Sequence, residues 1–213
     1  MTLGGNIMNE AFEKIEIEKR DRIINCAFKE FSKYKFDKAS TNNIVKEANI
    51  SKGLLFYYFN NKEDLFEYLS EFCVNTILEE IKNNIDWNIT DIFERVKQVV
   101  FLKIRITERY PYIFHFGKLL FDSESKDLIF KNRDLMELSS KIYSYNIDFT
   151  KFKEEVELKK AINIIRWTLE KYGEESSNRF KGIDKEIDYD ALLEEINSYI
   201  EVLRIAFYKG EYL

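Results

Sequence analysis

Hydrophobic residues near the start of the chain recur with the period of an α-helix. Apolar side chains stand at positions i, i+1, i+4, i+5 and i+8, which places them on one face and leaves the charged residues between them in water. They are Ile23, Ile24, Ala27, Phe28 and Phe31. The pattern predicts a helix from about residue 10 to residues 33–35. Residues 1–9 show no period and are expected to be disordered, with Met8 an alternative start to Met1.

Two short helices are predicted next, with a tight turn between them. The hydroxyl of Ser40 can accept a hydrogen bond from the free amide near Asn43, so the first of them begins there. Its buried side is expected to consist of Ile44, Val45 and Ala48. Asn49 tolerates the left-handed backbone of a turn, and Ser51 caps the next helix, which runs to Phe59. Two short helices joined in this way form a helix-turn-helix.

The second helix of this pair is expected to bury only part of its surface. Leu55 and Phe59 are four residues apart and would both point inward. The outer surface is then formed by Lys52, Leu54, Phe56, Tyr57 and Tyr58. An exposed face so rich in aromatic residues is typical of a surface that meets a partner. Asn61 caps the helix that follows.

The rest of the chain also has a helical pattern. We predict helices at 62–83, 90–109, 111–121, 126–145, 154–174 and 188–209. Pro111 marks a firm break, because the residue before a proline disfavours helical geometry. The chain has one proline and seven glycines, so the predicted fold class is all-α. A three-helix helix-turn-helix domain at 1–62 precedes a larger helical domain at 63–213.

Charge is distributed unevenly between these two parts. The net charge is −5, yet residues 14–62 contain eleven Lys and Arg against six Asp and Glu. This segment therefore carries +5 and the remainder −10. A basic segment that binds phosphates, joined to an acidic body, gives this asymmetry. Double-stranded DNA is the partner that it suggests.

Composition also bears on the compartment. No stretch approaches the ~20 apolar residues of a membrane span, and the start lacks the pattern of a secretory signal, so no membrane partner is expected and the protein is predicted to be cytoplasmic. Cys26 and Cys73 fit a reducing compartment and are interpreted as free core residues.

The helix-turn-helix segment resembles a known family in its residue types and spacing. The run is Ser40-Thr41-x-x-Ile44-x-x-x-Ala48-Asn49-Ile50-Ser51-Lys52-Gly53-x-Leu55-Phe56-Tyr57-Tyr58-Phe59-x-Asn61-Lys62-Glu63-x-Leu65. It is similar to the signature of the tetracycline-repressor (TetR) family and covers about a quarter of the chain. The family usually has glycine where this chain has Lys35 and Asn49, and tyrosine where it has Phe56.

The resemblance implies specific contacts with DNA. The helix after the turn, capped by Ser51, would enter the major groove, with Phe56 on its outer side. The residues implied as phosphate contacts are Thr41, Tyr58 and Lys62. Those implied to lie against base edges are Asn42, Lys52, Gly53, Leu54 and Tyr57. Their chemistry agrees, since Lys52 can donate to guanine and Asn42 can bridge adenine, while Leu54 can touch a thymine methyl group.

The last two predicted helices carry a wide apolar stripe. Its members are Ile162, Ile165, Leu169, Leu192, Ile196, Tyr199, Leu203 and Phe207. The stripe is wider than one core usually needs. Resemblance to the TetR family implies that these two helices pack against their copy in a homodimer.

A small-molecule effector of unknown identity is the remaining expected partner. An aromatic-lined cavity after residue 70 would suit an apolar or flat ligand, although such residues also simply fill helical cores. The candidate ligand-binding residues are Phe101, Arg105, Tyr110, His115, Tyr143 and Trp167. Taken together, the protein is predicted to be a ligand-responsive repressor that binds a palindromic operator.

An enzyme is the main alternative from another class. The chain has one histidine, no glycine-rich phosphate loop, no cysteine or histidine cluster with metal spacing and no recognisable nucleophile. We expect no catalytic residue, no metal and no cofactor. A helical adaptor that binds proteins and not DNA stays open as a second alternative, and salt-sensitive DNA binding would separate the two.

Overall fold

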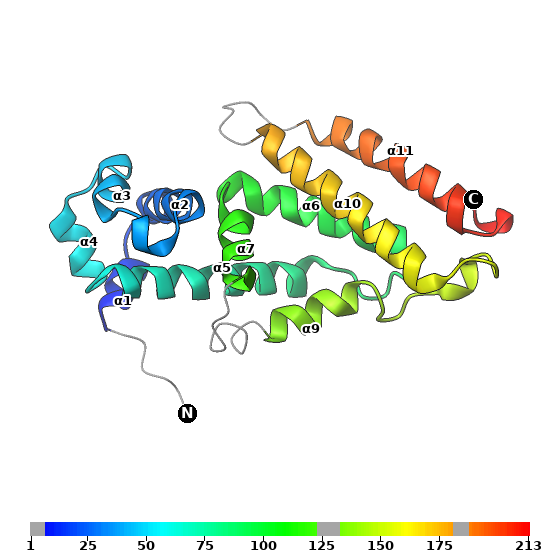
Figure 1. The fold of residues 1–213 in the computed structure, drawn as a ribbon, viewed down its shortest axis with the longest axis horizontal. Coiled ribbons are helices and arrows are strands. Elements are labelled where there is room, and N and C mark those ends of the chain that lie inside the picture. Colours follow the sequence, from blue (N-terminus) through cyan, green and yellow to red (C-terminus); the bar gives the residue numbers. More distant parts are fainter. Residues whose placement is uncertain (1–6, 123–132, 181–187) are drawn as a thin grey trace. The chain divides into compact units, whose positions relative to one another are not determined.

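The computed structural model describes residues 7–122, 133–180 and 188–213 as a set of helices (Figure 1). They are α1 (Ile7–Glu13), α2 (Ile17–Lys33), α3 (Thr41–Glu47), α4 (Lys52–Tyr58), α5 (Lys62–Asn84), α6 (Ile92–Arg109), α7 (Ile113–Asp122), α9 (Arg133–Ile142), α10 (Leu158–Phe180) and α11 (Tyr189–Phe207). Short 3-10 turns are η1 (Phe36–Lys38), η2 (Phe149–Lys151) and η3 (Gly210–Tyr212). Within these ranges the only strand-like pairing is a bridge between Phe152 and Tyr208. The all-α prediction is confirmed.

The helices form two compact units. The first consists of Met1–Ile77 and Arg109–Asn132, the second of Leu78–Glu108 and Arg133–Leu213. The first unit thus adds the start of α5 and all of α7 to the helices expected in a domain that ends at residue 62. Part of the helix predicted at 126–145 lies outside the described residues, and α9 is the part that the structure describes.

The first unit is built around phenylalanine side chains. α2 packs against both α3 and α7. The ring centroids of Phe28 and Phe116 lie 4.9 Å apart, and those of Phe66 lie 5.1 Å from Phe31 and 5.2 Å from Phe116. These tilted and edge-on contacts are the arrangement that aromatic rings prefer. α2 is therefore fixed on both sides by helices that are distant in sequence.

The two cysteines are buried in this unit and unpaired, as the sequence predicted. Burial raises the pKa of the Cys26 thiol to about 11 and that of the Cys73 thiol to about 12. Both thiols therefore stay protonated at neutral pH, as expected of inert core residues.

The start of the chain differs from the prediction in two ways. Residues 7–9 belong to α1, where we had expected disorder up to residue 9. The single helix predicted from about residue 10 is instead two helices, since the backbone of Glu16 is not helical (φ −52°, ψ 134°). The physical reason is Phe12, whose buried ring packs 4.9 Å from that of Phe59. α1 must run in a different direction from α2 to make this contact with Phe59, which follows the last residue of α4.

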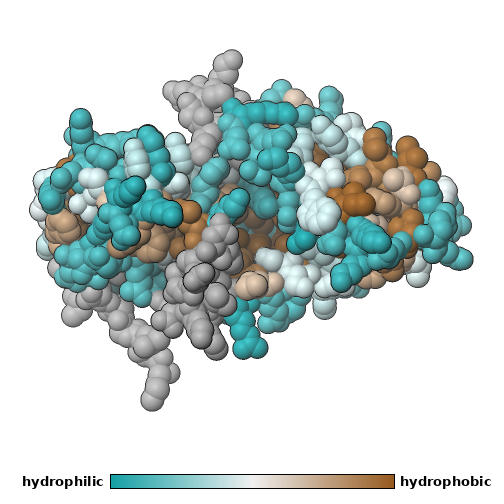
Figure 2. Space-filling model, in the orientation of Figure 1, coloured by the Kyte–Doolittle hydropathy of each residue, from teal (hydrophilic) through white to brown (hydrophobic). Residues whose placement is uncertain are grey.

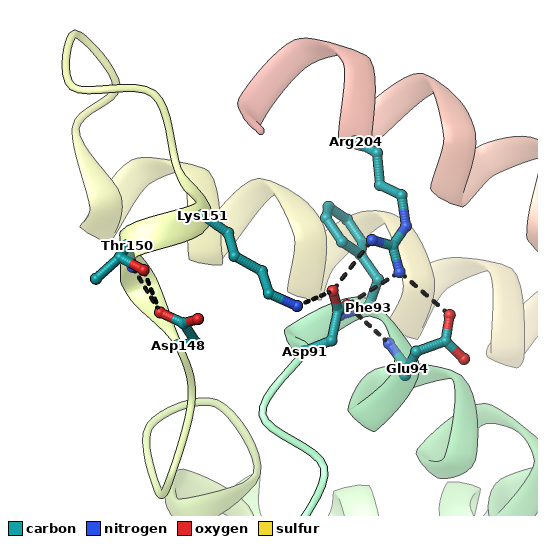
Figure 3. Close-up of polar contacts among 7 residues, drawn as sticks. All are labelled: Asp91, Phe93, Glu94, Asp148, Thr150, Lys151 and Arg204. Carbon is teal, nitrogen blue, oxygen red and sulfur yellow. Dashed lines mark hydrogen bonds and ion pairs between the residues drawn. The ribbon is translucent and has the colours of Figure 1, made fainter. Parts of the chain in front are cut away.

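The second unit has its own core among α6, α10 and α11. Buried members of its hydrophobic cluster are Val96, Val100, Ile104, Ile165, Leu169, Leu192, Ile196, Ile200 and Leu203. Asp91 precedes α6 and accepts hydrogen bonds from the backbone amides of Phe93 (3.0 Å) and Glu94 (3.3 Å). Its carboxylate also binds Lys151 and Arg204, which ties η2 and α11 to the start of α6 (Figure 3).

Candidate nucleic-acid interface

α3 and α4 form a helix-turn-helix whose turn matches the local sequence signals. Asn49 has φ 52°, the left-handed conformation that the sequence predicted. Ser51 is the N-cap of α4, and its Oγ accepts from the amide of Leu54 at 3.1 Å. Lys35, where the family usually has glycine, has an ordinary φ of −56°. A side chain is therefore tolerated at Lys35 without backbone strain.

One side of α4 is open to solvent. Lys52, Gly53 and Tyr57 are exposed, and the side chain of Tyr57 is 60% accessible. Leu54 and Phe56 are half-buried, and the Lys52 ammonium lies 5.8 Å from the centre of the Phe56 ring. Leu55 and Phe59 are buried, as predicted. The open side thus offers one cation, one phenol and a close approach to the backbone at Gly53.

Tyr58 is a correction to the predicted outer surface of α4. Its side chain is only 5% exposed, with its ring centroid 5.3 Å from that of Phe12. Tyr58 stands three residues after the inward-facing Leu55, so the two side chains share a face of the helix. α1, whose contact with α4 was not predicted, covers that face. A phosphate contact by the Tyr58 hydroxyl stays a prediction.

The start of α3 is held by a residue that the sequence analysis missed. The Ser40 side chain makes no capping hydrogen bond, contrary to the prediction. Instead Oε1 of the buried Glu30 accepts from the backbone amide of Ser40 (2.8 Å) and from Nδ2 of Asn43 (3.2 Å). The sequence did contain a signal for this contact. Glu30 is an acidic residue on the apolar face of α2, three residues after Ala27, and a buried carboxylate requires hydrogen-bond donors. Thr41 is half-buried and Asn42 exposed at this helix end.

Lys62, the first residue of α5, contacts the loop at residues 36–39 that precedes α3. Its Nζ donates to the backbone carbonyl of Phe36 at 2.8 Å and to that of Ala39 at 3.3 Å. The carbonyl of Asp37 is a third acceptor, at 3.5 Å, and the Phe36 ring centre is 4.5 Å away. The lysine that the resemblance implies as a phosphate contact therefore already binds its own chain.

The end of α3 is fixed from α2. Arg22 donates through Nε to the carbonyl of Ala48 at 3.0 Å, and Lys29 pairs with Glu47. The hydrogen bond with Glu47 raises the pKa of Lys29. Helix C-termini leave carbonyls without helical partners, and cationic side chains satisfy them well. Both ends of α3 are thus attached to α2.

The candidate ligand-binding residues belong to different units. Tyr110 and His115 lie in the first unit, where the buried Tyr110 hydroxyl donates to Asp21 at 2.9 Å and His115 is exposed. Burial and this hydrogen bond raise the pKa of Tyr110. In the second unit, Trp167 is 59% exposed, which argues against a place in an internal cavity.

The other ligand candidates also lie in the second unit. Arg105 is exposed and pairs with Glu80 at 2.5 Å. Phe101 and Tyr143 are half-buried. Burial is the main cause of the raised pKa of Tyr143, whose hydroxyl donates to Glu170 at 2.9 Å. Of the candidates in the second unit, Tyr143 packs against the hydrophobic cluster, and Phe101 is half-buried.

The apolar stripe predicted as a dimer interface lies mostly in the core of the protomer. Ile165, Leu169, Leu192, Ile196 and Leu203 are buried, Ile162 and Phe207 are partly buried against the same cluster, and Tyr199 is exposed. α10 and α11 pack on each other through these inner faces. Tyr199 is the one member of the stripe among the large apolar residues exposed on the two helices, which are Leu158, Ile164, Trp167, Tyr189, Tyr199, Val202 and Ile205. Figure 2 shows hydrophobic surface gathered over the second unit, on the side where α10 and α11 run in Figure 1.

Two kinds of site are not found in the described part of the chain. Within residues 7–122, 133–180 and 188–213, no group of three or more His, Cys, Asp or Glu side chains could hold a metal ion. No helix in these ranges has the length and apolar character needed to cross a membrane.

Comparison with a family model places the helix-turn-helix in a known group. Residues 23–69 match the model of the bacterial regulatory proteins of the tetR family. The match begins in α2, includes α3 and α4, and ends in α5. It covers the residues on which the resemblance was based, and α1 precedes it.

Relatives and solved structures agree with this match. The chain is 28% identical, over 97 residues, to the biofilm operon icaADBC HTH-type negative transcriptional regulator IcaR of Staphylococcus epidermidis; the aligned part is 45% of this chain and 51% of that protein. The chain spans about half the length of the curated relatives it matches.

The fold extends over a larger part of the chain than the sequence similarity. A TetR family transcriptional regulator from Chloroflexus aurantiacus has a TM-score of 0.63 at 18% identity, and the superposition covers 94% of this chain and 98% of that one. The regulator FadR from Bacillus subtilis, solved in complex with stearoyl-CoA, has a TM-score of 0.50 at 18% identity, with 85% and 96% covered. At such identities the likeness concerns the fold alone.

Proposed function

Because this chain belongs to the TetR family of bacterial regulatory proteins, we propose that it is a transcriptional repressor that binds a palindromic operator as a homodimer. The observation that carries the proposal is the open side of α4, which coincides with the family match. A helix of this kind can enter the major groove of B-DNA, where each base pair presents a distinct set of donors and acceptors.

The candidate DNA-contacting groups divide into two roles. Lys52, Gly53, Leu54 and Tyr57 on α4, with Asn42 on α3, lie against base edges and read sequence. Thr41 and the hydroxyl of Tyr58 contact phosphates, which position the protein without reading sequence. The accessible Lys52 and Tyr57 support this division most directly.

Repression is favoured over activation by one relative. IcaR of Staphylococcus epidermidis is a negative transcriptional regulator, and its similarity to this chain extends beyond the helix-turn-helix. A repressor needs only to occupy its operator.

Dimerisation is assigned to the outer faces of α10 and α11. Val202 and Ile205 are 66% and 61% exposed and stand three residues apart, as do Tyr199 and Val202. Ile164 and Trp167 have the same spacing on α10. Exposed apolar residues on two adjacent helices fit a second copy of the same helices, in a four-helix interface. The buried residues of the predicted stripe pack α10 and α11 together within the protomer, and this packing holds the outer face in place.

A small apolar effector that binds the second unit and lowers operator affinity completes the proposed function. Phe101 and Tyr143 are the candidates for an inward-facing lining. The fold is shared with a FadR that was solved with stearoyl-CoA, which supports ligand responsiveness in this architecture.

Selection of bound sequences from random duplex DNA tests the central claim. The wild-type protein should enrich a palindrome, and its affinity for that palindrome should fall steeply with salt, because each neutralised phosphate releases counterions. The double variant Lys52→Ala with Tyr57→Ala, with both side chains exposed, should fold and lose the enrichment. If the wild type enriches no sequence and its affinity for DNA does not change with salt, the proposal fails in favour of a helical adaptor that binds other proteins.

A further inference from the structure

The peptide bond between Ala39 and Ser40 is held at both of its polar groups. Its carbonyl accepts from Nζ of Lys62 at 3.3 Å, and its amide donates to Oε1 of Glu30 at 2.8 Å. In a trans peptide these two groups point in opposite directions. A cation from α5 and an anion from α2 therefore hold one peptide plane between them, directly before Thr41, the first residue of α3.

The three donors of Lys62 are all directed at this loop. An ammonium group has three N–H donors and no acceptor. The carbonyls of Phe36, Asp37 and Ala39 lie within hydrogen-bond distance of Nζ, and the Phe36 ring lies beneath it. A DNA phosphate could bind Nζ only by displacing one of these carbonyls. Lys62 also begins α5, whose start is fixed by Asn61 accepting from the amide of Asp64 at 2.7 Å.

Glu30 makes the matching contact from the interior. Its side chain is buried in the last turn of α2, next to Phe31 of the aromatic core. Besides the Ser40 amide, it accepts from Nδ2 of Asn43 on α3. A buried carboxylate needs such donors, because leaving it without them is costly. The hydrogen bonds therefore join the start of α3 to α2, which is itself packed on both sides.

We propose that Glu30 and Lys62 are positioning residues for DNA binding, which fix the Ala39–Ser40 peptide and so orient Thr41 and Asn42 without touching DNA themselves. The proposal rests on the proposed function. It departs from the role that the family resemblance implies for Lys62, because it removes this lysine from the phosphate contacts. DNA affinity should depend on Lys62 through geometry and not through charge.

The salt dependence of binding separates these two roles. A lysine that neutralises a phosphate contributes about 0.9 to the slope of log affinity against log salt. Replacing Lys62 by methionine should lower operator affinity roughly ten-fold or more, as expected for lost hydrogen bonds to a charged group, with the slope unchanged. Lys62→Arg, which keeps the charge and the donors, should restore part of the affinity. Lys52→Met is the matched control: Lys52 is proposed to read bases, so its loss should change the selected sequence, whereas Lys62→Met should leave the selected sequence unchanged.

Glu30→Gln tests the same peptide from the other side. Glu30 is an anion, so its replacement cannot remove a phosphate contact, yet operator affinity should fall at constant slope. Hydrogen–deuterium exchange of the full-length protein should be faster in the peptide that covers residues 36–43 in both Glu30→Gln and Lys62→Met. Should Lys62→Met prove unfolded by far-UV circular dichroism, Glu30→Gln and Lys62→Arg carry the test.

Three results would overturn the proposal. A slope reduced by about 0.9 per protomer in Lys62→Met, with exchange at 36–43 unchanged, would make Lys62 a direct phosphate contact. Unchanged operator affinity in both Glu30→Gln and Lys62→Met would remove the positioning role. If the wild type bound no duplex DNA at any salt concentration, the proposed function itself would fail and this proposal with it, whereas the first two results leave the proposed function intact.

Discussion

Arg204, in the last turn of α11, donates two hydrogen bonds to Asp91, at 3.0 and 3.1 Å (Figure 3). Lys151 adds an ion pair to the same carboxylate at 3.0 Å. The Asp91 side chain is largely buried and also caps α6 through two backbone amides. One carboxylate thus joins three segments of the second unit that lie far apart in sequence. α11 carries part of the proposed dimer face, so this carboxylate also orients that face.

Replacing Asp91 by asparagine should destabilise the protein by about 3 kcal/mol, the usual effect of removing one partner from a buried ion pair. Burial alone would raise the pKa of Asp91, but Lys151 and Arg204 outweigh it and hold the pKa below its ordinary value. A depressed folded-state pKa gives stability that is present above the unfolded value and is lost as the pH falls through the folded one. Wild-type stability should therefore decrease more than that of Asp91→Asn as the pH falls from about 5 to about 3.

Urea denaturation across this pH range measures both effects. Glu157→Gln is the control, because Glu157 forms an exposed ion pair with Lys160 at 2.7 Å. Exposed pairs contribute at most about 1 kcal/mol. Parallel pH profiles for the wild type and Asp91→Asn would contradict the assignment.

The two adjacent tyrosines of α4 should respond oppositely to substitution. Tyr57→Ala removes an exposed side chain, so it should change the selected DNA sequence while the free energy of unfolding stays within about 0.5 kcal/mol. Tyr58→Ala opens a cavity beside Phe12 and should cost about 3 kcal/mol. Tyr58→Phe keeps the packing and removes the hydroxyl. If that hydroxyl contacts a phosphate, Tyr58→Phe should weaken binding to all sequences alike.

Selection from random DNA and urea denaturation of the three variants distinguish these effects. A Tyr58→Phe protein with altered sequence preference and unchanged overall affinity would show that the hydroxyl reads a base. A destabilised Tyr57→Ala protein would contradict the exposed position of Tyr57.

Local signals in the sequence predicted much of the DNA-binding unit. The turn at Asn49 and the caps at Ser51 and Asn61 depend on residues within a few positions of each other, so they can be recognised without a structure. The partners of Glu30 and Lys62 are distant in sequence, for example the 26 residues between Phe36 and Lys62. The helical period of a sequence does not reveal such contacts, because they depend on how the helices pack in three dimensions.

The faces of α11 show a second limit of periodicity. This helix has apolar residues on an inner side, such as Ile196 and Leu203, and on an outer side, such as Val202 and Ile205. The sequence pattern predicted an apolar helix that exceeds the needs of one core, but it selected the inner side as the dimer interface. Both sides carry large apolar residues, and packing against α6 and α10 distinguishes them.

Helix α1 should stabilise the DNA-binding unit although it precedes the family match. The Phe12 ring contacts those of Tyr58, Phe59 and Tyr68 at centroid distances of 4.9–5.3 Å. Phe12→Ala should therefore cost about 3–5 kcal/mol, whereas Phe12→Leu, which keeps most of the volume, should cost about half of that or less. Thermal unfolding of both variants tests this. Equal stability of Phe12→Ala and the wild type would mean that α1 does not pack on α4 in solution.

The outer face of α11 provides the sharpest test of the proposed dimer. Ile196 and Ile205 are on the same helix, the first buried and the second exposed. Ile196→Asp would place an unpaired charge in the protomer core and should unfold the protein. Val202→Asp with Ile205→Asp leaves the charges in water within one protomer, so the helical circular dichroism spectrum should be unchanged. Across a dimer the same carboxylates would be buried and opposed, and sedimentation should show monomers.

The monomeric variant also predicts how binding to DNA changes. One recognition helix reads only a few base pairs, and the two-fold interface adds the second half-site. Val202→Asp with Ile205→Asp keeps the groups proposed to contact one half-site, so it should still bind DNA weakly. The slope of log affinity against log salt should fall to about half of the wild-type value, because half as many phosphates are neutralised. A double variant that sediments as a dimer and binds the full palindrome like the wild type would place the interface on another surface.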